Sequence, residues 1–171
     1  MTVNSDTKRI QQLYKLLDTY HEKLGFVEQD LAKSVPGEGR AAMRLQIKDI
    51  WKDIRDHEID LGDLLSRCAD AKTIPGNEAD DALAELNVHV DRLKGADKSN
   101  WPVEVLAKLD DLQAKLSEPG KAAAAKLKVS LPIIPLLVSY ELEMDTESTL
   151  VQVWHKITGL FRKSLPDPTK A

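Results

Sequence analysis

The sequence has little cysteine, few aromatic residues and no long hydrophobic run. Cys68 is the single cysteine among 171 residues, so neither an internal disulfide nor a cysteine metal cluster can form. The opening stretch, MTVNSDTKRI, lacks the apolar core of a secretory signal. The longest apolar run, LPIIPLLV at 131–138, is far shorter than the roughly 20 residues that span a bilayer. These absences lead us to expect a cytoplasmic protein.

A net positive charge is also absent. The 24 Lys and Arg residues are outnumbered by 28 Asp and Glu, which gives a formal net charge of −4. Nucleic-acid binding needs grouped cations that face phosphates, so we do not expect nucleic acid as a partner. Leu, Ala, Lys, Asp and Glu dominate the composition, and this excess of helix formers is typical of an all-α protein.

Reactive constellations are missing as well. The chain has no glycine-rich phosphate loop, no Gly-x-Ser-x-Gly elbow and no Cys-x-x-Cys pair. A di-iron bundle needs Glu-x-x-His on two helices, but Glu85 and His89 stand four apart and have no second copy. We therefore predict no catalytic residue, no metal and no cofactor, and a protein that is not an enzyme.

What the sequence does contain is a pair of apolar seams with heptad spacing, which is typical of one face of a helix. The first lies in a helix expected at about 6–33 and consists of Ile10, Leu13, Leu17, Tyr20, Leu24, Val27 and Leu31. The second lies in a helix expected at about 40–71 and consists of Met43, Ile47, Ile50, Ile54, His57, Leu61, Leu64 and Cys68.

The two seams are mirror-related about the Pro- and Gly-containing loop at 34–39. Residues at equal distances from the loop match, as Leu24 does with Ile50 and Leu13 with Leu61. A short loop between such seams favours an antiparallel helical hairpin. We predict a helical bundle built on a hairpin at 1–72. Shorter helices at 73–164 should pack against it in the same domain, followed by a flexible tail at 165–171.

The apolar run near residue 133 permits two structures. Pro132 and Pro135 interrupt a stretch that otherwise favours a helix, and a proline in a helix interior costs about 3 kcal/mol. We predict a break or kink around 130–135 with a further helical stretch after it. A short buried strand at 133–141 is the alternative.

Histidines in the hairpin have two interpretations. His57 in the seam is either a buried switch or proton carrier, or a polar residue that fixes register or reaches toward Tyr14 or Asp60 at the hairpin edge. Asp53, one turn from His57, should lie across from His21, which makes a His/His/Asp metal site conceivable. Exposed groups of this kind more often form a solvated face of ion pairs, and we favour that interpretation.

Apolar residues remain outside the seams and predict contacts beyond the hairpin. We predict a protein-interaction or signalling module whose partner is another protein or a second copy. The candidate interaction residues are Phe26, Trp51, Leu131, Ile134, Leu137 and Trp154.

A membrane-perturbing helical bundle is the alternative function. The apolar segment at 129–140 is flanked by Lys121, Lys126 and Lys128, and bases beside a Pro-broken apolar stretch can favour a membrane interface. A core element kinked by proline explains the same residues, and we favour the core element.

Two segments, together about half of the chain, resemble known bacterial proteins. The hairpin from Leu13 to Leu65 is similar to N-terminal coiled-coil hairpins of multidomain signalling proteins. The segment KLKVSLPIIPLLVSYELEMDTESTLVQVWHKITGLF, residues 126–161, resembles helical effector-associated modules of NLR-like (STAND) NTPases. The resemblance implies a homotypic or effector-coupling domain, with no catalytic motif and no individual functional residue.

Overall fold

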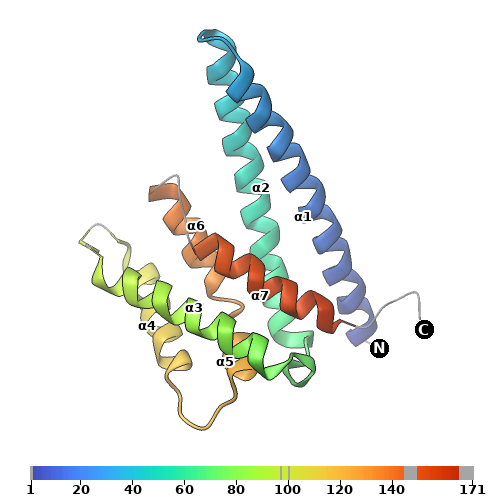
Figure 1. Cartoon of the computed structure of the whole chain (residues 1–171), viewed down its shortest axis with the longest axis vertical. Helices are drawn as coiled ribbons and strands as arrows, with labels where there is room; N and C mark the ends of the chain where they lie inside the picture. Colours follow the sequence, from blue (N-terminus) through green and yellow to red (C-terminus); the bar gives the residue numbers. More distant parts are fainter. Residues whose placement is uncertain (1, 97, 100, 145–149, 166–171) are drawn as a thin grey trace. The chain divides into compact units, whose positions relative to one another are not determined.

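All regular secondary structure within the described residues is helical. The computed structural model describes residues 2–96, 98–99, 101–144 and 150–165 (Figure 1). Within these ranges there are seven α-helices and one short 3-10 helix, and no strand. The predicted all-α class is confirmed. The predicted tail at 165–171 lies, except for Leu165, outside the described residues.

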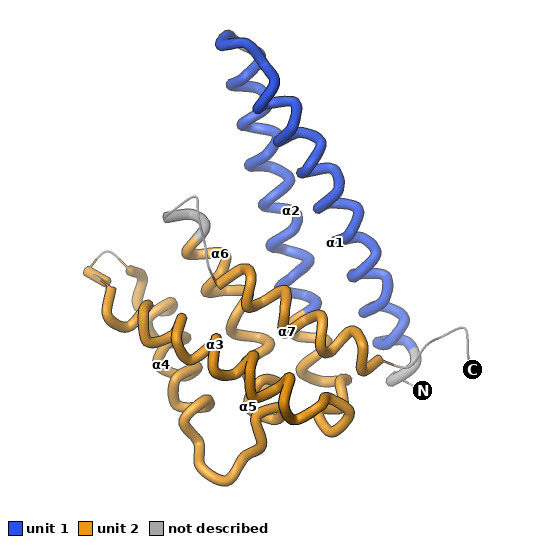
Figure 2. The backbone as a smooth tube through the Cα atoms, viewed as in Figure 1, with its two compact units in different colours: residues 1–61 blue, residues 62–171 orange. Residues whose placement is uncertain are grey.

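Two compact units share the chain. Unit 1 comprises residues 1–61 and unit 2 comprises residues 62–171 (Figure 2). The division falls inside one helix, α2 (Glu38–Cys68), so the last turns of α2 belong to unit 2. The boundary predicted from the sequence lies later, at residue 72, because the apolar seam continues to Cys68. The seam does not indicate that the residues after Leu61 pack with unit 2.

Unit 1 is the predicted antiparallel hairpin. Helices α1 (Thr2–Lys33) and α2 run side by side in opposite directions (Figure 1). The loop at 34–37 joins them, and the Ser34 hydroxyl closes α1 by donating to the carbonyl oxygen of Leu31 at 2.8 Å. Seam positions on both helices are buried, namely Ile10, Leu13, Leu17, Leu24, Val27, Ile50, Ile54 and Leu61. The periodicity therefore predicted both the hairpin and its inner face.

Unit 2 is built from shorter helices after the end of α2. They are η1 (Ala71–Thr73), α3 (Gly76–Gly95), α4 (Val103–Leu116), α5 (Ala123–Ser130), α6 (Ile134–Met144) and α7 (Leu150–Ser164). Helix α3 packs on α5 and α7, and α4 packs on α5 and α6. The core contains Leu86, Leu109, Leu127, Ile157 and Phe161, each almost completely shielded from solvent.

The proline-containing segment is a bend between two helices. Helix α5 ends at Ser130 and α6 begins at Ile134, and the two axes differ by 58°. Pro135 lies in the first turn of α6, where its missing N–H leaves no helical hydrogen bond unmade. The amides of Leu136 and Leu137 both donate to the carbonyl oxygen of Ile133. The predicted kink is confirmed, and the alternative of a strand at 133–141 is wrong.

Gly62 marks the tightest approach within unit 2. A Cβ atom at this position would lie 2.4 Å from the carbonyl oxygen of Leu131, 3.1 Å from Pro135 Cγ and 3.2 Å from Trp154 Cη2. The absence of a side chain thus lets the end of α2 pack against the α5–α6 bend and α7. This close packing explains why the last turns of α2 group with unit 2.

Candidate functional site

The hairpin segment at 24–50, called here the distal hairpin, exposes apolar side chains around the loop. Phe26 on α1 and Leu45 on α2 are 59% and 61% exposed. Val35 in the loop is more exposed still. Single exposed apolar residues are common on soluble proteins. The burial of the neighbouring seam residues therefore decides whether this surface is unusual.

Burial along the seam falls toward the loop. Ile10, Leu13 and Ile54, far from the loop, are fully buried. The seam residues nearest to the loop are only half-buried, namely Leu31, Met43 and Ile47. The distal hairpin therefore combines exposed outer residues with an incompletely covered inner face.

One flank of the hairpin carries an aromatic pair. The His21 imidazole meets the Trp51 ring edge-on, with ring centroids 6.3 Å apart, and Trp51 is half-buried. Gly25, one turn further along α1, has no atom within 4 Å of the position that a Cβ would take. This open helix surface permits a close approach by another helix.

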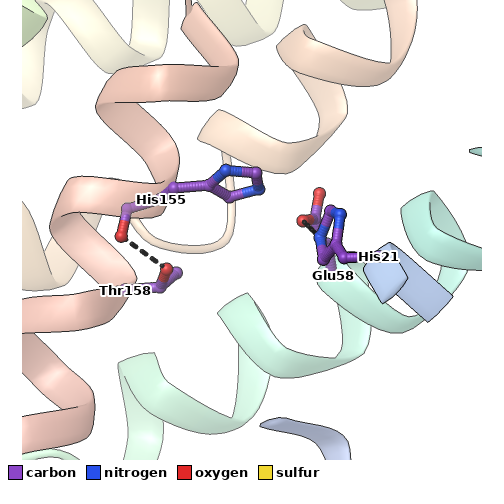
Figure 3. A network of polar contacts seen from close by, with 4 residues as sticks. All are labelled: His21, Glu58, His155 and Thr158. Atoms are coloured by element: carbon purple, nitrogen blue, oxygen red, sulfur yellow. Dashed lines mark hydrogen bonds and ion pairs between the residues drawn. The ribbon is translucent and has the colours of Figure 1, made fainter. Parts of the chain in front are cut away.

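His21 also lies beside a buried carboxylate of α2. Its Nε2 is 3.9 Å from Oε1 of Glu58, whose side chain is almost fully buried (Figure 3). The contact is an ion pair only when the imidazole is protonated. Figure 3 also shows a separate hydrogen bond within α7, in which the Thr158 hydroxyl donates to the carbonyl oxygen of His155 at 3.1 Å.

His57 occupies the seam as the spacing predicted, but its neighbour differs from the expectation. Its ring stacks on Tyr20, with centroids 5.5 Å apart, instead of reaching toward Tyr14 or Asp60. Its Nδ1 is buried and has no hydrogen-bond partner within the described residues. The stacking follows from the antiparallel register, which places Tyr20 about one turn from the residue expected opposite His57.

The conceivable His21, Asp53 and His57 site is not assembled. His21 faces Glu58 and Trp51, whereas His57 stacks on Tyr20 and Asp53 is exposed. Helical spacing alone predicted that His21 would lie across from Asp53. A linear pairing scheme does not resolve which neighbours each of these side chains contacts.

The six predicted interaction residues separate into two groups. Phe26 and Trp51 reach the surface of unit 1. The other four belong to the core of unit 2, namely Leu131, Ile134, Leu137 and Trp154. Buried side chains cannot contact a partner while the unit is folded, so we correct the prediction for these four. The bend turns the apolar run inward, and only Leu136 is left 36% exposed.

A groove between α4 and α6, called here the α4–α6 groove, was not anticipated. It has a volume of about 270 Å³ and is lined by Glu104, Val105, Lys108, Leu136, Leu137, Ser139 and Tyr140. At its aromatic end the rings of Trp101 and Tyr140 meet edge-on, with centroids 5.3 Å apart. Val105, Leu109, Leu112 and Leu116 have the spacing of one helix face, but spacing alone does not reveal a cavity.

The surface between α3 and α7 is charged with both signs. Lys156 on α7 donates a 2.5 Å hydrogen bond to the Glu85 carboxylate, which raises the pKa of Lys156. Burial lowers the pKa of His89 on the same helix as Glu85, with a further contribution from Arg92. Opposed charges of this kind neutralise each other in solvent and contribute little to stability.

Membrane-spanning potential is confined to one bent pair of helices. No single helix among the described residues has the length and apolar composition to cross a bilayer, whereas α5 and the part of α6 up to Glu141 meet those two criteria together.

Comparison with known proteins identifies no relative. No family model matches the chain, and no curated protein or solved structure resembles it significantly.

Proposed function

We propose that this chain is a protein-interaction or signalling module, not an enzyme, and that the distal hairpin is its contact surface. The observation that carries the proposal is the loss of seam burial toward the loop, together with the exposure of Phe26 and Leu45. Two helices shield only a narrow strip of each other. A third or fourth helix from a partner would cover the half-buried residues and complete a bundle.

The partner is a helix pair or helix from another protein, or the hairpin of a second copy. Burying a side chain as large as Phe or Leu contributes about 1.5–3 kcal/mol. Covering Phe26, Leu45 and the half-buried Met43 at once is enough to drive a specific contact. The resemblance to effector-associated modules supports a role in coupling a receptor to its effector, and we propose this finer role on that basis.

The test compares matched charge insertions in the two units. Phe26→Glu with Leu45→Glu changes the distal hairpin, and Val88→Glu on α3 is the control, because Val88 has the same 59% exposure as Phe26. Size-exclusion chromatography with light scattering measures self-association, and capture from lysate detects another protein. We expect the hairpin variant to lose the complex by at least about tenfold in affinity and the control to retain it.

Two results would contradict the proposal. The first is a wild-type chain that stays monomeric at all accessible concentrations and captures no protein. The second is equal loss of the complex in Val88→Glu, since that would place the contact outside the distal hairpin.

The alternative is a membrane-perturbing function of the α5–α6 pair. The pair has the composition of a bent span, but Leu131 and Ile134 are fully buried, so insertion requires unit 2 to open first. Flotation of the wild type with anionic liposomes is the test. Failure to float under conditions that keep the chain folded, and also under mildly destabilising ones, would remove this alternative.

A further inference from the structure

The α4–α6 groove has the size and lining of a site for one slender apolar ligand. Its volume of about 270 Å³ is about nine times the roughly 30 Å³ that a water molecule occupies in the liquid. A methylene group occupies a similar volume, so a chain of about eight to ten carbons fills the groove. Val105, Leu136 and Leu137 supply apolar walls, which suit such a chain.

The charges at the groove favour a negative head group on that ligand. Lys108 lines the groove and makes no ion pair within the described residues. A lysine of this kind lays its stem along apolar surface and holds its amino group at the rim. Glu104, one turn earlier on α4, opposes an anion there and is the single carboxylate among the lining residues.

Helix polarity adds to the effect of Lys108. The lining includes Val105 from the first turn of α4 and Leu136 and Leu137 from the first turn of α6. The first turn of a helix carries a partial positive charge. The groove thus lies beside the first turns of two helices, with one ammonium group and one carboxylate among its lining residues.

We propose that the α4–α6 groove binds a medium-chain carboxylic acid, with its chain between Val105 and the exposed Leu136 and its carboxylate at Lys108. This site belongs to unit 2 alone and is independent of the distal hairpin. It gives the module a way to respond to a free acyl chain, because an occupied groove ties α4 to α6.

The direct test is titration of the full-length chain with decanoate, below the concentration at which decanoate forms micelles. Calorimetry gives the affinity, and amide NMR shifts locate the site. We expect saturable binding with a Kd of about a millimolar or below, with shifts centred on Val105 and Leu136. Each methylene added from hexanoate to decanoate should tighten binding by up to about fourfold.

The head-group assignment is tested with two matched variants on one helix. Lys108→Gln should weaken decanoate binding by about two- to fivefold, and Glu104→Gln should strengthen it by a similar factor, as for an exposed ion pair. Neutral decanol should bind equally to both variants. The assignment of a carboxylate head group would be wrong if both variants changed the decanoate affinity by the same factor in the same direction. It would also be wrong if decyltrimethylammonium bound more tightly than decanoate.

The location is tested with a second matched pair. Leu136→Asp places a charge in the groove, and Val103→Asp places one outside it on α4, at a position that is 78% exposed. Both positions are exposed enough for the fold to tolerate the change. We expect loss of decanoate binding in Leu136→Asp alone. Retained binding in Leu136→Asp, absence of saturation in the wild type, or binding to phosphatidylcholine vesicles but not to free decanoate would each refute the site.

Discussion

The two units bury apolar surface in different ways, although both are made of amphipathic helices. In unit 1 a single repeating seam joins two long helices, and its burial declines toward the loop. In unit 2 five short helices enclose a core in which Trp154 and Phe161 are completely buried. A repeating seam tolerates local change because each residue contacts few others, whereas an enclosed core couples many residues. The comparison predicts that equivalent substitutions will differ in cost between the units.

The largest difference should come from the two tryptophans. Trp154→Ala empties a large buried site and should reduce the free energy of unfolding by about 3–5 kcal/mol. Trp51→Ala removes a half-buried ring and should cost about 1 kcal/mol. Urea denaturation followed by far-UV circular dichroism measures both.

Trp154→Phe is a useful intermediate, because the indole Nε1 of Trp154 is buried with no hydrogen-bond partner within the described residues. Phenylalanine therefore loses volume but no hydrogen bond. If Trp51→Ala proved as costly as Trp154→Ala, the contrast between seam and core would fail.

The next largest effect should come from Gly62→Ala. The new methyl group would lie 2.4 Å from the carbonyl oxygen of Leu131, and the backbone must shift to admit it. Overpacking of this kind costs about 1–3 kcal/mol, even though alanine favours the helix. Gly159→Ala on α7 is the matched control, because no atom lies within 4 Å of its Cβ position. A thermal shift of equal sign in the two variants would contradict the tight approach.

Gly25→Ala should act in the opposite direction, within the hairpin. Gly25 lies inside α1 and has open space around its Cβ position. Alanine reduces the conformational entropy lost on folding and should stabilise unit 1 by about 0.5–1 kcal/mol. Amide hydrogen exchange of α1 measures this locally. Destabilisation would show that a contact requires the bare backbone at Gly25.

The smallest effect should be a pH dependence confined to unit 2. Burial lowers the pKa of His89 from its ordinary value of 6.5, so below that value the unfolded chain binds a proton that the folded chain does not. Stability should therefore fall as the pH drops below about 6.5 and level off below the folded pKa. Arg92 adds to the lowering and Glu85 opposes it.

The difference in unfolding free energy between wild type and His89→Gln, measured from pH 8 to about pH 5, isolates this contribution. We expect the unfolding free energy of the wild type to fall relative to that of His89→Gln as the pH drops. A difference that is constant with pH would show that His89 titrates alike in the folded and unfolded chains.

Much of unit 1 could be predicted from the sequence because helical periodicity is a local signal. Seam residues such as Leu13 and Ile54 are spaced along one face, and that spacing requires a partner face. The loop with Pro36 and Gly37 then permits one antiparallel partner. The same spacing could not show which flank His21 takes, since flank depends on the rotation of each helix about its axis.

Unit 2 was harder to predict because the continuous apolar run at 131–138 carries no helical periodicity. Leu136 and Leu137 are neighbours in one run, yet the first is at the surface and the second is in the core. The bend after Ser130 determines which of the two side chains is buried. That bend depends in turn on packing with helices that are distant in the sequence. The sequence therefore showed that the run was apolar and kinked, but not that Leu131, Ile134 and Trp154 would be inaccessible.

The contact at Gly62 has a consequence for tracing the ancestry of this protein. Any descendant of the same ancestor that keeps the α5–α6 bend against α2 must keep a residue without a side chain at this position, whereas positions 25 and 159 are free to drift. A glycine eight residues after Ile54 and seventy residues before Pro132 of the Pro-x-x-Pro bend is therefore the pattern to look for in distant relatives.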